Sequence, residues 1–309
     1  MKKAIVTGGS GFAGFSLVKE LLRRGYYVLC PMRPGSPHNK RLECLKYELI
    51  NTEGQDNLAL IVLDMKDISM LPLVLKRKGE DFSGCLFFHL SWAGERDNYD
   101  SQRANLFNTM DAVRAAINIQ SSRILITGSQ AEYGSNAGGI RLSDGSFKAA
   151  DENTPLEPLN SYGVVKTAAM YLSRDLSRHE GISWNWLRIF SLYGEYEHPH
   201  TMLSYLRTSL ENGETPHLSA CTQSWDFLNV ADAARAMASV AEKGRPGEVY
   251  NIAHGEYRPL KEYTEILRDR IAPDIKIVYA AESRAPMLSL RPSVLKLKKD
   301  TGWEPEILF

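Results

Sequence analysis

A tyrosine and a lysine lie four residues apart in the segment SYGVVK, at Tyr162 and Lys166. If this segment is helical, both side chains lie on one face, about one turn apart. A neighbouring ammonium lowers the pKa of a phenol, which is ordinarily about 10. Such a pair could exchange a proton with a sugar or alcohol oxygen near neutral pH. An exposed helical pair without chemistry has the same spacing, so this motif alone leaves both interpretations open.

Polar residues stand at the ends of several apolar runs. Ser129 closes RILITGS, Asp64 closes LALIVLD, and His89 lies within CLFFHLS. Open α/β sheets place ligand-contacting residues at such strand ends, although Ser129 could equally be a helix cap or a turn hydroxyl. Asn105 lies inside an expected helix, where an asparagine needs a structural or functional reason.

The stretch TGGSGFAG follows the first apolar run and contains two overlapping glycine patterns. Gly9, Gly11 and Gly14 satisfy G-x-G-x-x-G, whereas Gly8, Gly11 and Gly14 satisfy the looser G-x-x-G-x-x-G. Both patterns are typical of a strand-to-helix turn that holds a dinucleotide pyrophosphate on backbone N–H groups. The loop by itself does not distinguish the two frames.

Short apolar runs that alternate with amphipathic segments must position these residues. Nearly continuous apolar strands separated by helices indicate a parallel sheet covered on both faces. The expected fold is therefore α/β, a doubly wound parallel sheet of the Rossmann type. The helix after the glycines is expected to point Phe12, Leu17, Leu21 and Leu22 inward. We expect strands at 3–8, 26–32, 58–64, 85–91, 123–129 and 182–190, and helices at 11–25 and 99–119.

The alternation loosens after Phe190. Helices are expected at 201–212 and 229–244, a strand at 248–254, and a basic helix within 293–303. These elements predict a smaller C-terminal α/β lobe that folds back on the sheet. The predicted dinucleotide-binding domain comprises residues 1–190 with 221–254, and the predicted substrate-binding lobe comprises 191–220 and 255–309.

The composition argues against binding to polyanionic partners. Lysine plus arginine and aspartate plus glutamate both number 37, so no net charge favours nucleic acid or an anionic membrane. The four cysteines are scattered, which fits reduced thiols better than a disulfide scaffold or a zinc site. The basic N-terminus is followed by too short an apolar run for a signal peptide, and no window approaches a membrane span. We therefore expect a cytoplasmic protein.

Motifs along almost the whole chain, in order and at the usual intervals, resemble those of the extended short-chain dehydrogenase/reductase family. This branch contains nucleotide-sugar epimerases, dehydratases and reductases. The resemblance implies the looser glycine frame, with Gly8, Gly11 and Gly14 as the functional glycines and Gly9 as an extra one. The motifs are TGGSGFAG, LDMKD, FFHLS, RANLFNT, TGSQAEYG, SYGVVK, LRIFSLYG, WDFLNVAD, GEVYNIAHG and KKDTGWEP.

The resemblance also implies roles for the matched residues. Tyr162 would be the catalytic acid/base, Lys166 would hydrogen-bond the nicotinamide ribose and lower the phenol pKa, and Ser129 would hydrogen-bond the substrate oxygen. Asn105 would be structural or part of a water relay. The remaining implied contacts are with the cofactor at Phe12, Asp64, Met65, Leu90 and Ser91, and with the substrate at Gln130, Tyr193 and Arg284.

The region after the second strand departs from the family pattern. An acidic residue that binds the adenosine ribose 2′-hydroxyl is expected about 20 residues past the glycines, but CPMRPGS has none before Glu43. Arg33 lies there instead and would suit a 2′-phosphate. NADP(H) is therefore favoured and NAD(H) is possible, with an ordinary loop arginine as the alternative.

A second departure concerns the substrate. Trp225 stands where the family often has an arginine that grips the diphosphate, which leaves Arg284 as the expected second arginine. The Trp225 indole could stack on a base or be buried in packing. His198 and His200 flank a proline without a nearby third ligand, so no metal site is expected.

A third departure concerns dehydration. Relatives that dehydrate nucleotide hexoses carry an Asp and a Glu after the Ser/Thr of the fifth strand, where this chain has Gln130 and Ala131. Neither side chain can take up or release a proton near neutral pH. Glu132 comes one residue later, and strand alternation would turn it to the other face.

Three functional hypotheses remain. The first is an NADP-dependent reductase of a 4-keto-6-deoxy nucleotide sugar, and the second is a nucleotide-sugar epimerase that retains NAD. The third is a catalytically silent cofactor-binding protein, which the presence of both Tyr162 and Lys166 disfavours. The family resemblance further implies a homodimer.

Overall fold

The computed structural model describes residues 1–52, 54–281 and 288–309. Its centre is a seven-stranded sheet in the order β13-β8-β5-β4-β1-β2-β3, and every neighbouring pair is parallel. The predicted α/β doubly wound fold is thus confirmed. The strands are β1 (Lys3–Thr7), β2 (Tyr27–Met32), β3 (Leu58–Val62), β4 (Leu86–His89), β5 (Arg123–Ser129), β8 (Ser183–Ile189) and β13 (Val249–Ile252).

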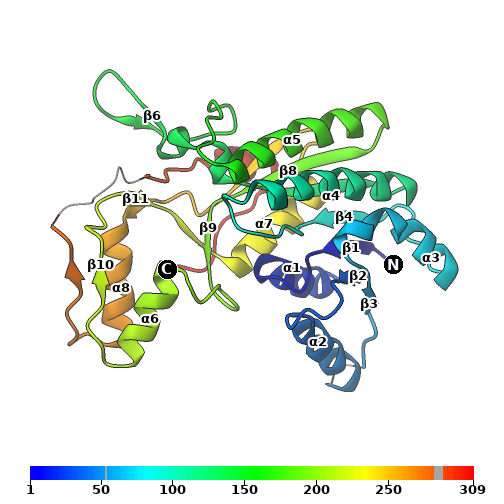
Figure 1. Ribbon diagram of the computed structural model, residues 1–309, viewed down its shortest axis with the longest axis horizontal. Helices are drawn as coiled ribbons and strands as arrows, with labels where there is room; N and C mark the ends of the chain where they lie inside the picture. The colour runs from blue at the N-terminus through cyan, green and yellow to red at the C-terminus, as the bar shows by residue number, and fades with distance from the viewer. Residues whose placement is uncertain (53, 282–287) are drawn as a thin grey trace.

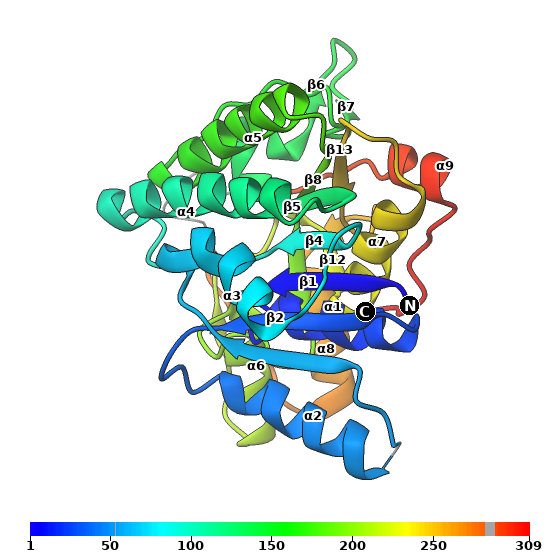
Figure 2. The same cartoon turned by 90° about the vertical axis from the view of Figure 1, so that its right-hand side faces the viewer.

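Helices cover both faces of the sheet, as Figure 2 shows. One face packs against α1 (Phe12–Arg23), α2 (Asn39–Thr52), α7 (Val230–Lys243) and α9 (Leu295–Thr301). The other face packs against the 3-10 turn η1 (Met65–Met70), α3 (Leu71–Lys78), α4 (Tyr99–Asn118) and α5 (Ser161–His179). Two apolar cores therefore enclose the sheet, which explains why its strands read as nearly continuous apolar runs.

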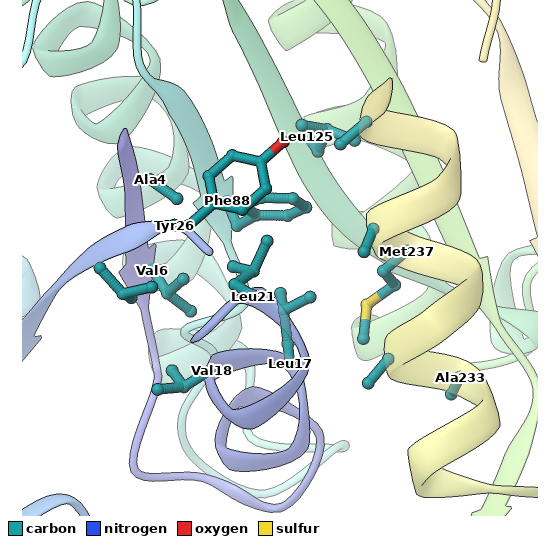
Figure 3. Close-up of a cluster of buried hydrophobic side chains, with 14 of the residues drawn as sticks. Ala4, Val6, Leu17, Val18, Leu21, Tyr26, Phe88, Leu125, Ala233 and Met237 are labelled. Carbon is teal, nitrogen blue, oxygen red and sulfur yellow. The ribbon is translucent and has the colours of Figure 1, made fainter. Parts of the chain in front are cut away.

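Figure 3 shows one of these cores, in which α1 and α7 lie against the sheet. Leu17 and Leu21 of α1 are fully buried, as predicted, and face Met237 of α7 and Phe88 and Leu125 of the sheet. Close packing on this face fixes α1, and with it the glycine loop that precedes the helix.

The C-terminal lobe lies to one side of the sheet in Figure 1. Its own core joins α6 (Met202–Glu211), α8 (Leu260–Ile271) and the paired strands β10 (His217–Leu218) and β15 (Val278–Tyr279). Two further strand pairs connect lobe and sheet: β9 (Ser191–Tyr193) with β12 (Phe227–Asn229), and β11 (Ser224–Trp225) with β14 (Arg258–Pro259). The exact division into two domains remains a prediction.

The remaining elements are short. Two 3-10 turns, η2 (Gln130–Glu132) and η3 (Ser135–Gly138), follow β5. A hairpin of β6 (Ile140–Arg141) and β7 (Phe147–Lys148) projects beyond α5 (Figure 1). In the described part of the chain, no helix combines the length and the apolar character needed to cross a membrane.

Candidate active site

A cleft of about 760 Å³ opens between the carboxyl ends of the sheet strands and the lobe. The sheet side contributes the glycine loop and the end of β5, and the opposite side contributes Thr201 from the lobe and Gln223 and Trp225 from the segment that connects lobe and sheet. Tyr162 and Lys166 lie between the two sides, on α5. The chain thus brings together most of the residues that the sequence singled out.

The glycine loop is a tightly folded backbone turn with no room for a side chain at Gly8 or Gly14. Gly8 has φ +74°, and the Gly11 N–H donates to the Gly8 carbonyl over 3.0 Å. A Cβ on Gly14 would lie 2.0 Å from that carbonyl oxygen, and a Cβ on Gly8 would lie 2.8 Å from the Ser91 nitrogen. Helix α1 begins directly after Gly11, with Phe12 as its first residue. A helix N-terminus behind a glycine-rich loop fits a dinucleotide pyrophosphate.

Phe12 lies partly outside the core that it was predicted to join. It is only half-buried and lines the cleft, as do Gly8, Gly11 and Gly14. Gly9 does not line the cleft; a Cβ there would meet the Cys30 sulfur at 2.8 Å, inside the core. The first glycine facing the cleft is therefore Gly8, which supports the looser frame.

Ser129 ends β5, faces the cleft and caps the following turn. Its hydroxyl accepts from the Ala131 N–H over 3.2 Å and donates to the Gln130 Oε1 over 3.1 Å. It is only 4% exposed yet lines the cleft beside Gln130. The two interpretations of Ser129, turn cap and site residue, are therefore compatible.

Close approach of α5 to this turn positions the tyrosine. The Asn160 side chain caps the helix by accepting from the Gly163 N–H over 2.9 Å. A Cβ on Gly163 would lie 2.4 Å from the Ala131 carbonyl oxygen, so only glycine allows this packing. Tyr162, next to Gly163, consequently lies in the cleft near Ser129.

Lys166 is buried one turn further along α5, with 2% of its surface exposed. Its Nζ donates to the Thr127 carbonyl over 2.6 Å and lies 5.9 Å from the centre of the Tyr162 ring. Burial lowers the pKa of Lys166 to about 7, although the Glu132 carboxylate opposes this effect.

The predicted lowering of the Tyr162 pKa by Lys166 does not emerge from the structure and stays a prediction. Burial raises the pKa of Tyr162 above its ordinary value, and Ser129 and Arg96 only partly oppose the increase. The Lys166 ammonium is held at the Thr127 carbonyl and lies 5.9 Å from the centre of the Tyr162 ring, over the ring.

The loop between β4 and α4 contributes two residues that the sequence analysis missed. The Trp92 ring centre lies 3.5 Å from the Lys166 Nζ, and the Arg96 guanidinium carbon lies 5.2 Å from the Tyr162 ring centre. Both residues line the cleft. An indole and a guanidinium just after a strand's carboxyl end were the available signal.

A second cavity, of about 350 Å³, adjoins the glycine loop where the adenosine half of a dinucleotide would lie. Arg33, Ser36 and His38 line it from the loop after β2, and the Asn39 amide holds this loop by donating to the Arg33 carbonyl over 2.9 Å. Asp64, Met65, Leu90 and Ser91 line the other side, and their contact with a cofactor stays a prediction.

The Asp64 carboxylate already has a structural function, because it caps η1 by accepting from the Lys66 N–H over 3.2 Å. Asn105 also borders this cavity, and its side chain clamps the Ala93 backbone. Its Oδ1 accepts from the Ala93 N–H over 3.1 Å, and its Nδ2 donates to the Ala93 carbonyl over 2.7 Å. This clamp gives Asn105 the structural reason that an asparagine within a helix requires.

One predicted substrate residue, Tyr193, is not brought into the cleft. Tyr193 is not among the residues lining it; its ring packs 4.8 Å from that of Phe309, and its hydroxyl donates to the Leu308 carbonyl over 3.4 Å. Arg284 lies outside the described residues. Trp225 lines the cleft, and its ring centre lies 6.3 Å from that of Phe227. Its indole therefore contributes both to the cleft surface and to packing.

Glu132 points away from the cleft into the core, and the cause differs from the predicted strand alternation. The chain leaves β5 and enters η2, where Ser129 and Glu132 form a capping box. The buried Glu132 carboxylate accepts from the Ser129 N–H over 2.7 Å and from the Arg188 Nε over 2.7 Å. Trp186 donates to both of its oxygens.

His198 and His200 lie on the loop between β9 and α6, with ring centres 5.1 Å apart. Within the described ranges, no cluster of three or more His, Cys, Asp or Glu side chains is arranged to hold a metal ion.

Comparisons with known proteins agree with this geometry. The sequence model of the NAD dependent epimerase/dehydratase family matches residues 4–253. A putative UDP-glucose 4-epimerase of Methanocaldococcus jannaschii is 23% identical, over 98% of this chain and 93% of that protein. A dTDP-glucose 4,6-dehydratase of Xanthomonas campestris is 24% identical, over 99% and 89% of the two chains.

Solved structures match over the same length. The UDP-glucose 4-epimerase of Thermotoga maritima, solved with UDP-glucose, superposes with a TM-score of 0.82 at 20% identity, covering 99% of this chain and 94% of that one. The dTDP-glucose 4,6-dehydratase of Bacillus anthracis, solved with NAD, superposes with a TM-score of 0.80 at 20% identity, covering 100% and 93%.

Proposed function

The chain belongs to the NAD dependent epimerase/dehydratase family, and we propose that it is an NADP-dependent reductase of a 4-keto-6-deoxy nucleotide sugar. The observation that carries the proposal is the cavity beside the glycine loop. Arg33, Ser36 and His38 line it, and its one acidic lining residue among those described is Asp64, whose carboxylate caps η1. A guanidinium pairs well with a ribose 2′-phosphate. A reductase binds NADPH and releases NADP⁺ at each turnover, so a site for the 2′-phosphate fits a reductase.

The proposed cofactor would be held by Gly8, Gly11 and Gly14 around its pyrophosphate, with Arg33 at the 2′-phosphate and Lys166 at the nicotinamide ribose. When bound, it would supply the hydride that reduces the sugar ketone. The chain's own residues would supply the proton. Tyr162 donates it to the ketone oxygen, and Ser129 hydrogen-bonds the same oxygen. The Lys166 ammonium stabilises the phenolate that remains.

The residues after Ser129 favour reduction over dehydration. Gln130 lines the cleft, whereas the Glu132 carboxylate is buried and paired with Arg188. Ala131 has no proton to exchange. Removal of water across the C5–C6 bond of a hexose requires an acid and a base beside the sugar, at the end of β5. The side chains that follow Ser129 provide neither. We therefore propose that the sugar arrives already dehydrated.

A nucleotide-sugar epimerase with retained NAD is the second candidate. It would use the same Ser129, Tyr162 and Lys166, and relatives named UDP-glucose 4-epimerases or solved with NAD support it. In that case the Arg33 side chain would be an ordinary loop residue.

We also propose a cytoplasmic homodimer. Helices α4 and α5 lie side by side on the outside of the sheet (Figure 2) and expose Phe107, Tyr171 and Leu172, which are 58%, 50% and 48% exposed. Large apolar side chains exposed on adjacent outer helices are found at interfaces between subunits. Light scattering of the purified protein would distinguish a dimer from a monomer.

The decisive experiment identifies the cofactor and its use. The purified protein is denatured, the released nucleotide is identified, and NADPH oxidation is followed with a 4-keto-6-deoxyhexose nucleotide. Turnover of NADPH by protein that carries no NAD supports the reductase. Stoichiometric bound NAD and conversion between epimers without net NADPH oxidation would support the epimerase. Tyr162→Phe is the matched variant; loss of its phenol proton should lower turnover about 10²–10⁴-fold.

A further inference from the structure

Trp92 is the least explained residue of the cleft, since no motif assigned it a role. The centre of its ring lies 3.5 Å from the Lys166 Nζ. The Trp92 and Tyr162 rings form a T-shaped contact, with centroids 5.9 Å apart at an interplanar angle of 88°. A cation within about 6 Å of a tryptophan face is attracted by the ring quadrupole. One indole therefore contacts both members of the proposed acid/base pair.

The indole is fixed rather than free to swing. Its Nε1 donates to the Gln102 Oε1 over 2.8 Å, and Gln102 is fully buried on α4. The Gln102 amide in turn donates to the Glu95 carbonyl over 2.8 Å. Asn105 clamps both backbone groups of Ala93, the next residue in the chain. Two polar side chains of α4 thus hold this loop against α5.

The Lys166 ammonium needs this support because few other groups nearby compensate its positive charge. Its one hydrogen bond within the described chain goes to the Thr127 carbonyl. The ionisable groups that face it are Tyr162 on its own helix, Glu132 on η2 and His89 at the end of β4. Glu132 favours the charged form, but it is already paired with Arg188. A buried ammonium without sufficient partners loses its proton.

We propose that Trp92 is a positioning residue for the Tyr162–Lys166 pair. Its face keeps the buried ammonium charged and in place, and its T-shaped contact fixes the phenol ring. The proposal rests on the function proposed above, because it gives Tyr162 and Lys166 their roles in proton transfer. Within that function, Trp92 sets the pH range over which the pair works.

The direct test is the titration of Lys166 in the cofactor-free protein. The lysine ¹³Cε resonances are followed against pH, and the Lys166 signal is assigned from its absence in Lys166→Met. Trp92→Leu removes the aromatic face and should lower the pKa of Lys166 by about 0.4 to 1.5 units. Trp92→Phe keeps an aromatic face and should give a smaller decrease, and it remains informative if the leucine variant fails to fold.

Trp225→Leu is the matched control, because it removes another indole of the same cleft that does not lie over Lys166. It should leave the Lys166 titration unchanged. The alkaline limb of the kcat/KM profile should shift to lower pH together with the measured pKa of Lys166. Above that pKa, kcat/KM of Trp92→Leu should be about 3- to 30-fold lower than that of the unmodified protein.

An unchanged or increased Lys166 pKa in both Trp92 variants would overturn the proposal. Failure of the roles that the proposed function gives Tyr162 and Lys166 would look different. Tyr162→Phe would then retain near-normal turnover, whereas the titration of Lys166 in the Trp92 variants would still report whether the indole holds the ammonium.

Discussion

Replacement of His89 by glutamine should make the protein less sensitive to acid. His89 ends β4 and is fully buried between two hydroxyls, with Nδ1 2.9 Å from the Thr7 Oγ1 and Nε2 3.2 Å from the Thr109 Oγ1. Burial, together with the nearby Lys166 ammonium, lowers the pKa of His89 from 6.5 to about 3. The imidazole therefore stays neutral in the folded protein at pH 5.

The size of the effect follows from proton linkage. Between the two pKa values the unfolded chain binds a proton at His89 that the folded chain does not, so stability falls as the pH falls below 6.5. At pH 5 the interval is about 1.5 units, and at about 1.4 kcal/mol per unit this site contributes about 2 kcal/mol to the loss. His89→Gln cannot gain a proton, so its stability should decrease about 2 kcal/mol less between pH 7 and pH 5.

Urea unfolding followed by tryptophan fluorescence at the two pH values measures this difference. His217→Gln, at an exposed position, is the control and should show the pH dependence of the unmodified protein. An equal loss of stability in His89→Gln and the unmodified protein would refute the reasoning. So would a histidine ¹³Cε1 resonance, absent from the spectrum of His89→Gln, that titrates near pH 6.5 in the unmodified protein.

Four further predictions concern the cofactor loop, the core and the reaction. Arg33→Ala should weaken NADPH binding about tenfold or more while leaving NADH binding unchanged, as measured by fluorescence titration, because only the pairing with the 2′-phosphate is lost. Gly14→Ala should abolish binding of either nucleotide and lower the melting temperature, since its Cβ would lie 2.0 Å from the Gly8 carbonyl oxygen; unchanged binding would contradict the tight-loop argument. Glu132→Gln should lower the free energy of unfolding by about 3–5 kcal/mol, because it leaves the buried Arg188 guanidinium without its carboxylate. The control Asp175→Asn, in an exposed pair with Arg178, should change the free energy of unfolding by less than about 1 kcal/mol. Nucleotide-linked glucose or mannose should yield no 4-keto-6-deoxy product, as judged by the loss of one water in mass spectra; steady formation of that product would make Glu132 the first residue to reconsider.

The sheet and the glycine loop could be predicted because local composition encodes them. Each strand is a short apolar run, and the crowding at Gly8 and Gly14 appears in the sequence as missing side chains. Helix α2 was not predicted, since it buries only Leu42 and Leu49 and so presents almost no repeating apolar face. Helix α8 was missed although it buries Leu260, Tyr263 and Leu267, because its charged residues dilute that pattern.

The contacts within the site depended on tertiary structure. Trp92 reaches Lys166 only because the loop after β4 contacts the first turn of α5, where the Tyr162 N–H donates to the Arg96 carbonyl. The motif placed Tyr193 at the cleft, but packing against Phe309 at the far end of the chain holds its ring elsewhere. Glu132 shows a third limit: strand alternation predicted its direction away from the cleft, yet the observed cause is a capped turn joined to Arg188. Residue types at strand ends indicate a site, but not which side chains meet there.

The position of β13 has a consequence for synthesis on the ribosome. This strand pairs with β8 at one edge of the sheet but follows it in the chain by about sixty residues, from Ile189 to Val249. At about 5–20 residues per second, translation leaves the β8 edge uncovered for roughly 3–12 seconds after β8 is made. An uncovered apolar strand edge is a template for pairing with other nascent chains. Slow codons between β8 and β13 would prolong that interval and lower the yield of native protein without changing any native contact.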